Sequence, residues 1–66
     1  MQGKLVKNDY GRYCIGENLE LTSGEKLEVY TASGWIPMQV EHDGTEYYLT
    51  SSLVSFYPKH VYARIA

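Results

Sequence analysis

Three side chains in the sequence belong to types that commonly act as nucleophiles, bases or metal ligands: Cys14, His42 and His60. A nucleophilic cysteine needs a neighbouring base, and nothing in the spacing of these residues brings either histidine to Cys14. One cysteine and two histidines also fall short of a structural zinc site, which uses four ligands with pairs at short spacing. We therefore expect no catalytic residue, no metal and no cofactor, and we do not expect an enzyme.

Charge and length limit the partners of the chain. The formal net charge of the 66 residues is −2, and the basic residues are scattered as Lys4, Lys7, Arg12, Lys26, Lys59 and Arg64. Because nucleic-acid affinity depends on Lys and Arg neutralising successive phosphates, we do not expect a nucleic-acid partner. The sequence has no apolar run of the length of a signal peptide or membrane span, so we expect a cytoplasmic protein without a membrane association.

The pattern of apolar residues is typical of short β-strands. Apolar and polar side chains alternate in 26–30 and 35–42, and shorter alternating segments occupy 13–15, 19–21 and 61–65. Glycines between these segments mark turns. For 51–58 we expect a turn or one turn of 3₁₀ helix, because two serines can cap a short helical turn and Pro58 cannot donate to a sheet.

The strongest local signal is Asp43-Gly44, a dipeptide that suits the two-residue turn of a β-hairpin. With that turn, the predicted hairpin covers 35–50. Its predicted register pairs His42 with Thr45, Glu41 with Glu46, Val40 with Tyr47, Gln39 with Tyr48 and Met38 with Leu49. This register places two glutamates directly opposite each other on the outer face, which is an unfavourable pair unless a basic group lies opposite.

The predicted fold is all-β: a single domain over 1–66, with five or six short antiparallel strands that curl into a small barrel. Curling buries the shared apolar face and pairs the strand edges. The predicted core consists of Leu27, Val29, Ile36, Met38, Val40 and Leu49.

Part of the chain resembles a known fold family. The stretch from Leu21 to Tyr30, followed by Gly34-Trp35 and then by His42-Asp43-Gly44, resembles the central part of Src-homology-3 (SH3) domains. The resemblance implies an SH3-like barrel in which Trp35 matches the aromatic position that lines the ligand groove. Peptide-binding members also carry an Ala-Leu-Tyr-Asp-Tyr segment and a Pro-Ser-Asn-Tyr segment. This sequence lacks both, so the resemblance does not imply proline-rich ligands.

A longer stretch, from Leu5 to Leu49, resembles a family of uncharacterised short bacterial proteins that are found often on mobile elements and are defined as a domain of unknown function. The matching segments are Gly11-Arg12-Tyr13, Leu27-Glu28-Val29, Gly34-Trp35-Ile36-Pro37, His42-Asp43-Gly44 and Tyr47-Tyr48-Leu49. The resemblance implies a bacterial cytoplasmic setting and no established activity.

The outer face of the predicted sheet carries the candidate binding site. Its residues are Tyr30, Trp35, Glu41, Glu46, Tyr48 and Tyr62. Large rigid aromatic side chains give contact area at low cost in entropy, so we expect a protein-interaction module with a basic partner, acting as a monomer or weak dimer. Two alternatives stay open. One is an adaptor that stacks single-stranded nucleic acid on the aromatic rings, and the other is a structural or inhibitory accessory protein.

The single cysteine gives the first testable prediction. Because Cys14 cannot close a disulfide within the chain, the melting temperature should be the same with and without reductant. Differential scanning fluorimetry under both conditions measures this directly. A large loss of stability on reduction would instead show a covalent dimer.

Overall fold

A computed structural model describes residues 2–16 and 19–65 of the chain. The described residues form strands and turns without a helix, and therefore without a helix long and apolar enough to cross a membrane. The strands are β1 (Gln2–Lys7), β2 (Tyr13–Ile15), β3 (Leu19–Glu20), β4 (Lys26–Thr31), β5 (Gly34–His42), β6 (Tyr47–Thr50), β7 (Ser55–Phe56) and β8 (Tyr62–Ile65). The predicted all-β class is confirmed.

All eight strands belong to one antiparallel sheet, in the order β3-β2-β1-β8-β4-β5-β6-β7. The first and last strands of the chain, β1 and β8, are therefore neighbours in the middle of the sheet. In the described part of the chain, the edge strands β3 and β7 do not pair with each other, so the sheet is open. The predicted closed barrel is not what the sheet shows.

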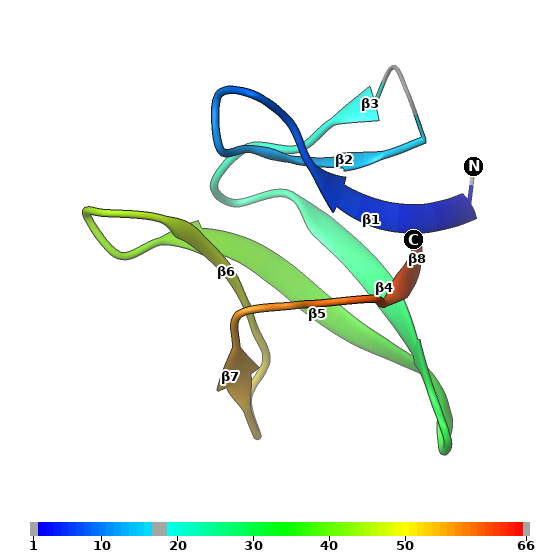
Figure 1. Cartoon of the computed structure of the whole chain (residues 1–66). Helices are drawn as coiled ribbons and strands as arrows, with labels where there is room; N and C mark the ends of the chain where they lie inside the picture. Colours follow the sequence, from blue (N-terminus) through cyan, green and yellow to red (C-terminus); the bar gives the residue numbers. More distant parts are fainter. Residues whose placement is uncertain (1, 17–18, 66) are drawn as a thin grey trace.

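Strand β1 changes its partner halfway along its length. Residues Gln2 to Lys4 pair with β8, whereas Leu5 to Lys7 pair with β2. This change divides the sheet into two parts that face each other: Figure 1 shows β1, β2 and β3 above the long strands β4, β5 and β6. A single sheet folded in this way buries an apolar face that a flat sheet of the same strands would leave in water.

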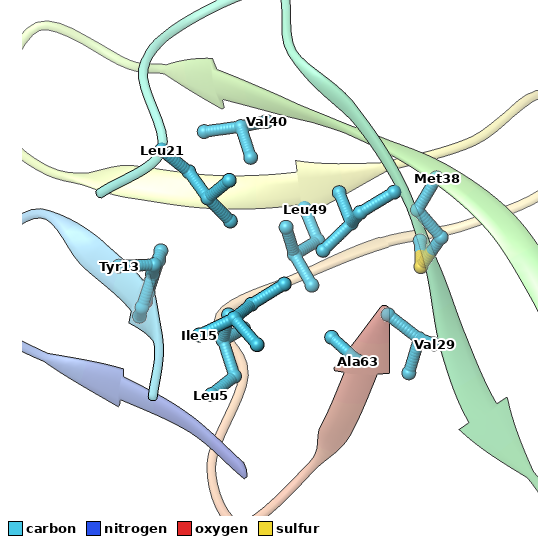
Figure 2. Close-up of a cluster of buried hydrophobic side chains, with 10 residues drawn as sticks. Leu5, Tyr13, Ile15, Leu21, Val29, Met38, Val40, Leu49 and Ala63 are labelled. Carbon is cyan, nitrogen blue, oxygen red and sulfur yellow. The ribbon is translucent and has the colours of Figure 1, made fainter. Parts of the chain in front are cut away.

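The core fills the space between the two parts of the sheet. Figure 2 shows side chains of β1, β2, β4, β5, β6 and β8 converging on one cluster. Five of the six predicted core residues are buried, and Ile36 is partly buried and packs against the cluster. The β1–β2 part and β8 add residues that the sequence pattern did not single out: Leu5, Tyr13, Ile15 and Ala63.

The hairpin between β5 and β6 has a different register from the predicted one. Val40 pairs with Leu49 and not with Tyr47, which instead lies opposite His42. The loop therefore contains four residues, because the Asp43 carboxylate accepts hydrogen bonds from the backbone N–H groups of Thr45 (2.7 Å) and Glu46 (2.8 Å). A shift by two residues keeps the side chains of β6, Tyr47 to Thr50, on their predicted faces. Leu49 accordingly remains fully buried.

Of the two alternatives predicted for 51–58, the structure has a turn and no 3₁₀ helix. The Ser51 hydroxyl accepts hydrogen bonds from the N–H groups of Leu53 and Val54, both at 3.2 Å. These bonds close a tight turn, after which β7 pairs with β6. Strand β1 was also not predicted, since only Leu5 and Val6 are large and apolar in it.

Truncation of Leu27 tests the position of the core. Leu27 is fully buried in the cluster, so Leu27→Ala should lower the free energy of unfolding by about 2 to 5 kcal/mol, through lost burial and the cavity left behind. Urea denaturation followed by circular dichroism measures the change. The matched control is Leu53→Ala, at a side chain that is 93% exposed, with an expected change within about 0.5 kcal/mol. Equal effects of the two substitutions would place Leu27 outside the core.

Candidate functional site

Tyr30 and Trp35 lie directly opposite each other on β4 and β5. Their ring centroids are 5.2 Å apart, and the rings meet edge to face. The turn between them is held by Thr31, whose hydroxyl donates to the Gly34 carbonyl (2.9 Å), and by Gly34 itself at a φ of 100°, where a side chain would be strained. The turn therefore fixes the two rings against each other, an arrangement worth about 0.5 to 1.5 kcal/mol beyond burial.

Arg64 of β8 lies over the Trp35 ring. Its guanidinium carbon is 4.1 Å from the ring centroid, and its Nε donates a hydrogen bond of 2.7 Å to the Glu28 carboxylate on β4. Glu28 and Arg64 are direct partners in the sheet. The ion pair thus holds the guanidinium in the position that allows a cation–π contact with Trp35.

Tyr62 of β8 extends this surface. Ala63 pairs with Val29 in the core, so the preceding residue Tyr62 lies at the level of Tyr30 on the opposite, outer face. Tyr62 is 56% exposed and Tyr30 is 59% exposed. We call Tyr62, Tyr30 and Trp35 the aromatic row. The structure therefore brings together three of the six predicted site residues.

Glu41 and Tyr48 lie on the same face but in a second group. They are direct partners on β5 and β6, and the Glu41 carboxylate accepts a hydrogen bond from the Gln39 amide. The Tyr48 ring packs at 5.7 Å against the ring of Tyr57. Glu41 is six positions from Trp35 on β5, or about 20 Å along an extended strand, so this group is separate from the aromatic row.

Glu46 does not belong to the predicted site. The four-residue loop removes it from the position opposite Glu41, so the predicted pair of glutamates does not form. Glu46 instead lines a groove that also contains Lys4, Lys7 and Tyr57. Glu46 leaves its predicted position because the Asp43 carboxylate accepts hydrogen bonds from two backbone N–H groups, which lengthens the loop.

A hydrogen bond between Tyr57 and Asp43 joins two segments that sequence reasoning left unconnected. The Tyr57 hydroxyl donates to the second Asp43 carboxylate oxygen at 2.6 Å. This bond, together with the backbone N–H groups of Thr45 and Glu46, lowers the pKa of Asp43 to about 2. The same bond, with some desolvation, raises the pKa of Tyr57 to about 12. No local pattern marks it, because the partners are 14 residues apart.

Cys14 and His42, two of the three side chains considered first for chemistry, have structural surroundings. Cys14 is buried in β2, and its Sγ lies 3.9 Å from the Arg12 carbonyl. The His42 ring packs against the Tyr47 ring, and its Nδ1 accepts the Gly44 N–H at 3.1 Å. Within residues 2–16 and 19–65, no group of three or more His, Cys, Asp and Glu side chains is placed to hold a metal ion.

These features define a small all-β domain whose candidate site is a surface of exposed aromatic side chains. The chain belongs to the family described as Domain of unknown function (DUF5348), whose model matches residues 3–64. The resemblance to an uncharacterised family seen in the sequence is thereby confirmed. Searches of curated proteins and of solved structures found no significant match.

The hydrogen bond between Asp43 and Tyr57 predicts how stability depends on pH. The folded pKa of Asp43 is lowered, so its contribution is complete above the ordinary aspartate pKa and is lost as the pH falls toward about 2. The folded pKa of Tyr57 is raised, so its contribution is complete below the ordinary tyrosine pKa and is lost as the pH rises toward about 12. Tyr57→Phe should therefore make the free energy of unfolding depend less on pH at both the acidic and the alkaline end.

The measurement is an NMR titration of the Asp43 carboxyl carbon in the wild type and in Tyr57→Phe. We expect the pKa of Asp43 to rise in the variant, although the two backbone N–H donors remain. Tyr10→Phe is the control, at a ring that is 85% exposed. An unchanged Asp43 titration in Tyr57→Phe would contradict the assigned cause.

Proposed function

We propose that this chain is a protein-binding module without catalytic activity, and that the aromatic row is its contact surface. The observation that carries the proposal is the placement of Tyr62, Tyr30 and Trp35 side by side across β8, β4 and β5, with the two tyrosines more than half exposed. The Tyr30 and Trp35 rings pack against each other on adjacent strands, so little entropy is lost when a partner covers them.

The charges around the row favour an apolar partner segment over the basic one predicted from the sequence. The predicted glutamate pair does not form, and Glu28 is already neutralised by Arg64. A partner would therefore cover the rings with apolar side chains and accept hydrogen bonds from the tyrosine hydroxyls. The paired arginine keeps Trp35 in place, so the surface is ordered before binding.

The fold family of the open sheet is part of the same proposal. We infer that the open sheet is an SH3-like barrel that is incompletely closed, because its two edge strands do not pair with each other among the described residues. This is supported by the central pairing of β1 with β8 and by the single core shared by both parts of the sheet. A cytoplasmic location in a bacterium is likewise proposed, as is a monomeric or weakly dimeric state.

The two alternative functions have less support at this surface. Stacking of single-stranded nucleic acid on the row would need cations beside the rings to neutralise phosphates. Arg64 is paired with Glu28, which leaves Lys4, the partner of Tyr62, as the basic residue next to the row. A structural or inhibitory accessory role would use the same contact surface, so identifying the partner also tests that role.

The experiment is a quantitative pull-down from the native host, followed by binding measurements with the purified partner. The double variant Tyr30→Ala/Tyr62→Ala should reduce binding at least about tenfold, because truncating central aromatic residues of an interface costs more than about 1.4 kcal/mol. Both side chains are exposed, so the fold should persist.

The matched control is Tyr10→Ala/Leu53→Ala, which removes two large side chains that are more exposed than Tyr30 and Tyr62 and lie away from the row, and it should leave binding unchanged. Titration with labelled single-stranded DNA at low salt provides the second arm. Equal binding by both double variants would contradict the proposal. So would salt-sensitive DNA binding that is lost only in the row variant.

A further inference from the structure

The pairing between β1 and β8 stops abruptly, and a groove begins there. The last backbone hydrogen bond joins the Leu5 N–H to the Val61 carbonyl at 2.8 Å. His60 then adopts a φ of 55°, a left-handed conformation that side chains rarely take, and turns the chain away from β1. A groove of about 410 Å³ opens between β1 and residues 57–60.

Lys7 presents its backbone to this groove. The Asn8 N–H donates to the Arg12 carbonyl, so Asn8 faces β2. Backbone groups alternate between the two edges of a strand, and Lys7 therefore directs its N–H and C=O to the opposite edge, the one that β8 has left. Within the described residues, no backbone hydrogen bond joins Lys7 to the segment 57–60. An exposed strand edge of this kind can accept a further strand.

The groove gathers positive charge that is dispersed in the sequence. Lys4, Lys7 and Lys59 all line it, together with His60, and among the described lining residues Glu46 is the single acidic one. The chain has six Lys and Arg residues, so half of them meet here. The two salt bridges of the described residues use Arg12 and Arg64 and involve no lysine. Lysines that line one groove repel one another electrostatically. An anionic side chain between them would replace this repulsion with attraction.

The floor of the groove is apolar. Leu5 and Tyr13 belong to the core, and Pro58 completes the lining on the other side. The Lys7 ammonium lies 5.4 Å from the Tyr13 ring centroid, so this side chain already covers part of the floor. A ligand that fits must therefore offer apolar groups to the floor and anionic groups to the rim.

We propose that this groove binds an extended acidic segment of a partner protein, which adds as a strand to the free edge of β1 at Lys7. An extended peptide directs alternate side chains to opposite sides, so acidic residues can reach the lysines while apolar residues contact the floor. A nucleic acid fits less well, because its continuous phosphates would have to pass Glu46 and the overall charge of the chain is −2. The groove adjoins the aromatic row at Lys4, which pairs with Tyr62, but the two surfaces share no aromatic side chain of the row, so each can be tested without altering the other.

The test is fluorescence anisotropy with a labelled peptide that alternates glutamate with leucine and valine. We expect saturable binding that weakens with added salt and is lost when the glutamates are replaced by glutamine. Lys59→Glu should weaken binding about tenfold or more, since it places a like charge at the rim. The matched control, Lys26→Glu, makes the same change in net charge outside the groove and should alter affinity less than about twofold.

Chemical-shift changes at the Lys7 amide on peptide addition would support strand addition directly. Equal affinity for the glutamate and glutamine peptides would overturn the proposal, and so would absence of peptide binding. Binding of oligodeoxythymidine that is tighter than peptide binding and is lost in Lys59→Glu would assign the groove to nucleic acid instead. These variants leave Tyr30 and Tyr62 intact, so a negative result here leaves the proposed function of the aromatic row untouched.

Discussion

The fold depends on one constraint: β1 must pair with β8 at its start and with β2 at its end. The change of partner lies between Lys4 and Leu5, and Leu5 is the residue that β1 contributes to the core. The change of partner brings the β1–β2 part of the sheet over β4, β5 and β6 (Figure 1). A chain of 66 residues has few apolar side chains to bury, and folding one sheet over itself lets both parts share a single core.

Both candidate surfaces follow from this arrangement. The central position of β8 places Tyr62 and Arg64 beside β4, which completes the aromatic row and holds Trp35 under a guanidinium. The departure of β8 from β1 at His60 opens the second surface, the lysine-lined groove. One surface is apolar and close to neutral, and the other is cationic at its rim. Two partners, or two segments of one partner, could therefore bind without competing for the same side chains.

Alternation of apolar residues was sufficient to predict the class of fold, the strands around Leu27 and Val40, and the faces of the side chains in those two strands. A register error of two residues in the hairpin left these faces intact. The loop itself could not be predicted, because the Asp43 carboxylate competes with the two-residue turn by binding backbone N–H groups.

Contacts between distant segments were also beyond the sequence pattern. Strand β1 carries little apolar pattern, and it is fixed by pairing with β8 near the other end of the chain. The sequence pattern also does not predict that Lys7 and Lys59 line one groove, because they are distant in the chain.

Hydrogen exchange of individual backbone N–H groups, followed by NMR, tests the central claim most directly. The Leu5 N–H should be strongly protected by its bond to Val61, whereas the Lys7 N–H should exchange at close to the rate of an unstructured chain. Protection of Lys7 equal to that of Leu5 would show that the pairing continues past Leu5 and that the sheet has no open edge there.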